Sequence, residues 1–139
     1  MIFKKVLLFA LFSIFAMANS DNNLTIYQDY NKSIEIAKKE DKPIFILFTK
    51  EHCQWCKKLK SNLLTNKEIL KRLKDEYIVL FLDKNRDKYP TKIYNIQGVP
   101  TVFLISPTQE IYTQIVGYHS KPKDYLKWFN YVKIEREEL

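Results

Sequence analysis

The two cysteines of this chain, Cys53 and Cys56, are separated only by Gln54 and Trp55. Thiols at this spacing can alternate between a dithiol and a disulfide, bind a metal ion, or form a structural cross-link. The cross-link is the weakest of the three hypotheses, because a disulfide that closes so short a loop constrains the unfolded chain little. The spacing therefore favours chemistry at the pair over a purely structural role.

Metal binding needs ligands beyond the two thiolates. A tetrahedral zinc shell would take them from His52, His119 or carboxylates, and the sequence has no second CxxC and no HxxxH pair. Covalent haem attachment requires histidine directly after the second cysteine, whereas residue 57 is lysine. With only two glycines in the chain, a Gly-rich phosphate loop is excluded as well. We therefore expect no metal, and no cofactor besides a redox-active Cys53–Cys56 disulfide.

The neighbours of the pair favour a thiolate at Cys53. In a helix that begins there, the side chain lies beside unpaired backbone N–H groups and the positive end of the helix dipole. Cys56, one turn later on the same face, is then the buried resolving thiol. Lys57 and Lys58 add positive charge, and a protonated His52 would also stabilise a thiolate. For these last three residues, an ordinary solvated surface role is the alternative.

The segments that must position the pair alternate between helix and strand. Apolar residues at helical spacing predict a helix over residues 28–39 that ends before Pro43. Uninterrupted apolar runs, rich in aromatic and β-branched residues, predict three strands covered on both faces. These runs are residues 44–48, 77–82 and 102–105. Between the first two, leucines and isoleucines predict a helical segment broken near Thr65-Asn66, so these two strands should run parallel.

The second half of the chain contains a hairpin signal. We expect a short helix between Tyr89 and Tyr94. Residues 110–116 alternate their side chains and follow turn residues 107–109, which predicts an antiparallel hairpin with the preceding strand. A final helix begins near Pro122, since proline is favourable in a first turn. The predicted fold class is α/β, with a mixed central sheet that combines a parallel β-α-β half and an antiparallel hairpin, flanked by helices.

Three short motifs, in this order, resemble those of the thioredoxin fold. Cys53-Gln54-Trp55-Cys56 directly follows a buried strand, Gly98-Val99-Pro100-Thr101 precedes the hairpin, and Val116-Gly117 precedes the final helix. The resemblance covers residues 28–139. It points to exported thioredoxin-like thiol–disulfide oxidoreductases, in which KPIFILF followed by CxWCKKL is a familiar pattern.

The resemblance implies a mechanism and a peptide groove. Cys53 would attack a partner's disulfide to form a mixed disulfide, and Cys56 would then release the reduced partner. The Val99–Pro100 bond should be cis and face the pair, although only about 5% of X–Pro bonds are cis in general. Its backbone groups would bind the client peptide. Gly117 and Tyr118 should line the same groove, and an ordinary strand end is the alternative for them.

Two departures from thioredoxins bear on this chemistry. Thioredoxins carry a buried acid six residues before the first cysteine, where this chain has Leu47, and the nearer Glu51 should be exposed. They also have tryptophan before the first cysteine and Gly-Pro between the two, so the family's redox potential does not carry over. The residues expected to tune the pair are His52, Gln54, Trp55 and Lys57.

The N-terminus has the pattern of a targeting signal. Two lysines, an apolar stretch and small residues at Ala16 and Ala18 form the plan of a secretory signal peptide cleaved after Ala18. An uncleaved anchor is the alternative, but the apolar stretch is shorter than the roughly 20 residues that span a bilayer. The predicted organisation is a signal peptide over 1–18, a flexible N-terminus over 19–27 and a thioredoxin-like domain over 28–139.

Charge and compartment indicate the partners. Loss of residues 1–18 removes two lysines and no acid, so the formal charge falls from +7 to +5. Acids interleaved among the lysines are typical of a solvated surface rather than a nucleic-acid site. We expect a monomer, periplasmic or otherwise exported, that acts on cysteine-containing exported proteins and exchanges electrons with a membrane thiol–disulfide carrier.

The direction of exchange has competing hypotheses. Oxidases of this compartment usually insert a helical domain into the thioredoxin fold, and the span from Tyr77 to Thr101 has no room for one, which favours a reductase. A disulfide oxidase or isomerase of the same fold is the alternative within the redox class. A non-catalytic module that holds client proteins in the groove is the alternative outside it.

Overall fold

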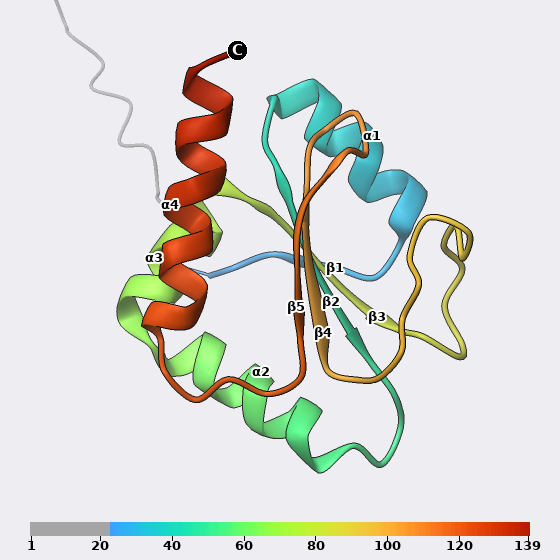
Figure 1. Ribbon diagram of the computed structural model, residues 1–139. Helices are drawn as coiled ribbons and strands as arrows, with labels where there is room; N and C mark the ends of the chain where they lie inside the picture. The colour runs from blue at the N-terminus through green and yellow to red at the C-terminus, as the bar shows by residue number, and fades with distance from the viewer. Residues whose placement is uncertain (1–22) are drawn as a thin grey trace, which may run out of the picture.

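Strands β2 (Ile44–Thr49), β3 (Ile78–Asp83) and β4 (Thr101–Ile105) are buried at every residue in the computed structural model, which describes residues 23–139. Successive side chains of a strand point to opposite faces of the sheet. Burial of every residue therefore means that both faces are covered, as the uninterrupted apolar runs predict. The three strands lie at the centre of the molecule (Figure 1).

The strand pairing produces a mixed sheet. The five strands lie in the order β1-β3-β2-β4-β5, with β1 (Ile26–Tyr27) and β5 (Ile111–Val116) at the edges. β3 is parallel to both β1 and β2, whereas β4 is antiparallel to both β2 and β5. The predicted α/β class, with a parallel half and an antiparallel hairpin, is confirmed.

Helices pack on both faces of this sheet (Figure 1). One face carries α1 (Tyr30–Glu40). The other carries α2 (Gln54–Thr65), α3 (Lys67–Glu76) and α4 (Lys123–Glu137). Alternate residues of β2 supply the two hydrophobic clusters, with Phe45 and Leu47 under α2, α3 and α4 and their neighbours in the chain under α1.

Polar side chains set the ends of the helices. The carboxylate of Asp29 accepts a hydrogen bond from the Lys32 N–H at 3.0 Å, so α1 begins at Tyr30 rather than at residue 28. The side-chain oxygen of Asn66 accepts one from the Ile69 N–H at 2.9 Å and separates α2 from α3. The break predicted near Thr65-Asn66 is therefore confirmed, as is a final helix that starts after Pro122.

The helix predicted between Tyr89 and Tyr94 is wrong, because residues 89–94 run through turns and irregular backbone. Tyr94 is buried, and its ring centroid lies 5.4 Å from that of Phe48 and 4.9 Å from that of Phe103. Its hydroxyl is 2.8 Å from the hydroxyl of Tyr30. These contacts with distant residues hold the segment in a loop that covers the sheet.

The flexible segment predicted over residues 19–27 is wrong at its end, because Ile26 and Tyr27 pair with Val79 and Leu80 to form β1. The pairing extends the sheet by one strand and anchors the chain ahead of α1. The predicted signal peptide, 1–18, lies outside the described residues. Within residues 23–139, no helix is both long enough and apolar enough to cross a bilayer.

Candidate active site

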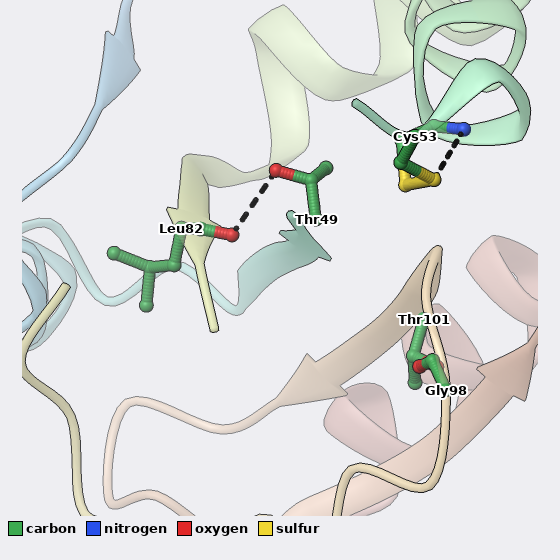
Figure 2. The surroundings of a disulfide bond; sticks show 6 residues. Thr49, Cys53, Leu82, Gly98 and Thr101 are labelled. Atoms are coloured by element: carbon green, nitrogen blue, oxygen red, sulfur yellow. Dashed lines mark hydrogen bonds between the residues drawn. A yellow bond between two sulfur atoms is a disulfide. The ribbon is translucent and has the colours of Figure 1, made fainter. Parts of the chain in front are cut away.

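Cys53 and Cys56 form a disulfide at the first turn of α2, just beyond the carboxyl end of β2 (Figure 2). Cys53 is the N-cap residue, and its Sγ accepts a hydrogen bond from the Cys56 N–H at 3.2 Å. Cys56 is 2% exposed and Cys53 is 8% exposed. The helix thus begins at the pair as predicted, and the second cysteine is the more deeply buried.

A short turn connects β2 to the disulfide. His52 adopts a positive φ of 56°, a left-handed conformation that non-glycine residues seldom take. This turn directs the chain from the end of the strand into α2. His52 and Glu51 are both exposed, and so are Gln54 and Lys57 beyond the first cysteine. These side chains lie at the solvent-facing rim of the site.

The loop that contains Pro100 belongs to the surroundings of the disulfide, where Figure 2 draws Gly98 and Thr101. The Val99–Pro100 peptide bond is cis, as predicted. The Thr101 hydroxyl donates a hydrogen bond to the Gly98 carbonyl at 2.7 Å and closes the turn around the proline. The buried Pro100 is therefore held by a local hydrogen bond at the start of β4.

Gly117 connects this loop to the end of β5. Its N–H donates a hydrogen bond to the Pro100 carbonyl at 2.8 Å, and its φ of 81° lies in the left-handed region that favours glycine. The sharp turn at Gly117 brings Tyr118 against α2. The predicted groove residues Val99, Pro100, Gly117 and Tyr118 thus belong to two adjoining segments of backbone.

Tyr118 contacts two side chains on one face of α2. Its ring centroid lies 5.1 Å from that of Trp55, and its hydroxyl accepts a hydrogen bond from Asn62 Nδ2 at 2.7 Å. Trp55 keeps 56% of its surface exposed in spite of this contact. Asn62 was not among the predicted site residues, although its spacing of seven residues from Trp55 places both on the same helix face.

Leu47 occupies a fully apolar position, as its residue type suggests. It is 0% exposed, and its strand neighbours are Phe81 and Val102. The last residue of β2, the strand that precedes the disulfide, is Thr49. Its hydroxyl donates a hydrogen bond to the Leu82 carbonyl at 3.4 Å (Figure 2). No carboxylate therefore takes the place that the buried acid has in thioredoxins.

Asp83, at the end of the neighbouring strand β3, already accepts hydrogen bonds from the backbone. Its carboxylate accepts hydrogen bonds from the backbone N–H groups of Asn85 and Arg86, and these bonds lower its pKa. A carboxylate stabilised in this way is a weak base.

His119 points toward α4 rather than toward the cysteine pair. Its Nε2 is 3.1 Å from the Val116 carbonyl oxygen, and its Nδ1 is 3.9 Å from the Asp124 carboxylate. Among residues 23–139, no three histidine, cysteine or acidic side chains are grouped as ligands for a metal ion.

Residues 30–133 match the family model of the thioredoxin-like domain. The chain belongs to this family. Its CxxC disulfide at a helix N-terminus, beside a cis-proline loop, is the arrangement of a thiol–disulfide oxidoreductase.

Solved structures share the fold. A thioredoxin from Thermus thermophilus superposes with a TM-score of 0.67 at 21% identity, over 81% of this chain and 88% of that one. The DsbH oxidoreductase superposes with a TM-score of 0.61 at 18% identity, over 78% of this chain and 85% of that one.

Mouse Anterior gradient protein 3 (Mus musculus) is a curated relative. It is 27% identical over 100 residues, which cover 71% of this chain and 59% of that protein. The chain therefore matches a little over half of the length of this relative.

Proposed function

We propose that this protein is an exported thiol–disulfide oxidoreductase that reduces the disulfides of other exported proteins through the Cys53–Cys56 pair. The observation that carries the proposal is a cysteine pair at the N-terminus of α2, adjacent to the cis-proline loop. Cys53 is the more exposed of the two sulfur-bearing residues, which suits a nucleophile, and the buried Cys56 suits a resolving thiol.

The exchange proceeds in two steps. The Cys53 thiolate of the reduced protein attacks one sulfur of a client disulfide, which forms a mixed disulfide and releases the other client sulfur as a thiolate that takes up a proton. Cys56 then loses its proton and attacks Cys53 Sγ, which forms the intramolecular disulfide and releases the second client thiolate. The client gains two electrons and the protein loses two, so a dithiol donor must reduce the pair again.

The backbone around the pair supports the first step. The N–H of Cys56, which contacts Cys53 Sγ at 3.2 Å, would stabilise negative charge on that sulfur in the reduced form. The same end of α2 carries the positive pole of the helix dipole. His52, Gln54, Trp55 and Lys57 surround the nucleophile at the rim, where they would tune its potential.

The pattern of residues 1–18 supports export, with cleavage after Ala18. In an exported protein, a reduced pair needs a supply of electrons from a membrane thiol–disulfide carrier, since the surroundings are oxidising. We expect a monomer that binds cysteine-containing exported proteins and no nucleic acid. The absence of an inserted helical domain between β3 and β4 in the described chain favours the reducing direction.

Insulin reduction in the presence of dithiothreitol tests the activity. The mature protein should accelerate the precipitation of reduced insulin, and Cys53→Ser should abolish the acceleration. Cys56→Ser should still attack and accumulate mixed disulfides with client proteins, because its resolving thiol is missing. Activity that survives in Cys53→Ser would contradict the assignment and leave a client-binding module as the alternative.

The equilibrium reduction potential against glutathione tests the direction. A value near about −270 mV supports a reductase, whereas one near about −120 mV identifies an oxidase. The N-terminal residue of the protein purified from its native cell tests export, and Asn19 is the expected residue.

A further inference from the structure

Lys58 lies beside two aromatic rings at the edge of the candidate active site, and the centroids of these rings are 5.1 Å from each other. Its ammonium nitrogen is 5.2 Å from the ring centroid of Trp55 and 5.1 Å from that of Tyr118. Cation–π attraction to each ring favours this position of the ammonium group, and the Asn62 side chain bonds the Tyr118 hydroxyl. The ammonium group of Lys58 therefore has a preferred position beside the two rings.

The location of this charge is set by the phase of α2. Trp55 and Lys58 lie one turn apart on a helix face immediately beside the buried face formed by Cys56 and Leu59. Tyr118 follows Gly117, whose N–H is bonded to the Pro100 carbonyl. Contacts through Gly117 and Tyr118 thus link the cis-proline loop to the Lys58 ammonium group.

The charges nearby are not neutralised by the protein itself. Within residues 23–139, no carboxylate lies within 4 Å of the ammonium groups of Lys50, Lys57, Lys58 or Lys60. Glu51 is the single acid between residues 50 and 60. The ammonium groups of these lysines can therefore pair with an anionic partner.

We propose that Lys58 is a specificity-determining residue that selects client peptides with an acidic side chain next to the reactive cysteine. The inference rests on the proposed function and adds the class of client to it. The Trp55 and Tyr118 rings supply an apolar surface for the same peptide, and Lys58 supplies an ammonium group already ordered for a carboxylate. Ordering it in advance lowers the entropy lost when the ion pair forms.

The test uses three synthetic peptides with one internal disulfide, which differ only in a glutamate, glutamine or lysine beside the first cysteine. The fully reduced protein is mixed with each, and the second-order rate constant of peptide reduction is measured at low salt. We expect the glutamate peptide to react about three- to fivefold faster than the glutamine peptide, and the lysine peptide to react slowest. The difference should shrink at 0.5 M salt, where the screening length falls to about 4 Å.

Three variants assign the preference to Lys58. Lys58→Met should bring the ratio of glutamate to glutamine rates close to one, and Lys58→Arg should retain the preference because the charge and the ring contacts remain. Lys60→Met is the matched control on the same helix, since its ammonium lies 5.6 Å from the Phe81 ring rather than beside Trp55 and Tyr118. It should keep the preference for the glutamate peptide.

Each outcome separates this inference from the function on which it rests. Equal reduction of all three peptides, or a preference that survives Lys58→Met, would overturn the role of Lys58 and leave the oxidoreductase intact. A preference lost equally in Lys60→Met would assign it to the general positive field and also overturn the specific role. Failure to reduce any peptide would overturn the proposed function and this inference with it.

Discussion

Basic side chains at the two ends of the parallel strands have different surroundings. Near the amino ends of β2 and β3, four basic residues pair with carboxylates at distances from 2.6 to 3.4 Å. The pairs are Lys71–Asp75, Arg72–Glu76, Arg136–Asp41 and Lys42–Glu40. At the carboxyl ends, Arg86 pairs with Asp83 at 3.3 Å after β3, but the four lysines at positions 50, 57, 58 and 60 have no such pair in the described part of the chain.

The difference separates charges that act within the protein from charges that can act on a partner. The field of a paired charge is largely cancelled by its oppositely charged neighbour. An exposed ion pair also adds little to the free energy of unfolding. An unpaired charge extends its field into solvent over a screening length of about 8 Å at physiological salt. We therefore expect changes at the amino end to alter stability, and changes at the disulfide end to alter reactivity.

The largest effect should come from the core beneath the paired end. Phe129 is 0% exposed, and its ring centroid lies 4.9 Å from that of Tyr77 and 6.1 Å from that of Phe45. Phe129→Ala should lower the free energy of unfolding by about 3 to 5 kcal/mol, because it leaves a cavity. Urea denaturation measures this, with Ile134→Ala, at a half-exposed position on the same helix, as a control that changes it little. A loss below about 1 kcal/mol for Phe129→Ala would show that the core repacks.

High pH should lower the free energy of unfolding through the buried Tyr125. Burial raises the pKa of Tyr125 to about 12, whereas an unfolded tyrosine titrates near 10. The unfolded state then releases its proton first, so this stabilisation is complete below pH 10 and is lost as the pH rises toward 12. We expect a loss of about 2 to 3 kcal/mol from this residue, measured as the free energy of unfolding across this range. Tyr125→Phe should remove that part of the pH dependence, and an unchanged profile in the variant would contradict the assignment.

A moderate effect is expected from the most buried of the paired cations. The Arg72 side chain is 15% exposed, donates to both carboxylate oxygens of Glu76 and to Asn130, and lies over the Phe129 ring. Arg72→Met should lower the free energy of unfolding by about 1 to 2 kcal/mol and leave the rate of disulfide exchange unchanged. Lys71→Met, which breaks an exposed pair on the same helix, should leave the free energy of unfolding nearly unchanged. If both variants lose the same amount, burial is not what distinguishes them.

The smallest effect should come from an unpaired lysine next to the disulfide. Lys57→Met should change the free energy of unfolding by less than about 0.5 kcal/mol. It should slow the reaction of the reduced protein with anionic dithiobisnitrobenzoate by about twofold, while the reaction with neutral dipyridyl disulfide changes less. Lys133→Met, at an exposed position on α4, should leave the ratio of these rates as it is. An equal change in both variants would remove the distinction between the two ends.

Local sequence predicted most of the elements and the position of the cysteine pair. The break near Asn66 was predicted, and its side chain bonds an N–H three residues later. Asp29 caps α1 in the same way, but it was not predicted as the cap. The apolar runs of β2, β3 and β4 mark strands buried on both faces. The motif around Pro100 also predicted the cis bond that the structure shows.

The errors and omissions lie where contacts join distant parts of the chain. The segment 89–94 is a loop because the Tyr94 ring packs against Phe48 of β2 and Phe103 of β4. Ile26 and Tyr27 form a strand only because β3 offers a free edge. The Trp55, Lys58 and Tyr118 cluster joins residues about sixty positions apart, so no local pattern indicates it.

The sequence by itself determined the fold class and placed the cysteine pair at the start of a helix, since periodicity and capping act over a few residues. Only the tertiary structure decided what faces that pair. The turn at Gly117 carries Tyr118 onto α2, and this contact forms a ring pair beside which the Lys58 ammonium group lies. Which side chains meet there depends on how strands far apart in the chain pair and turn.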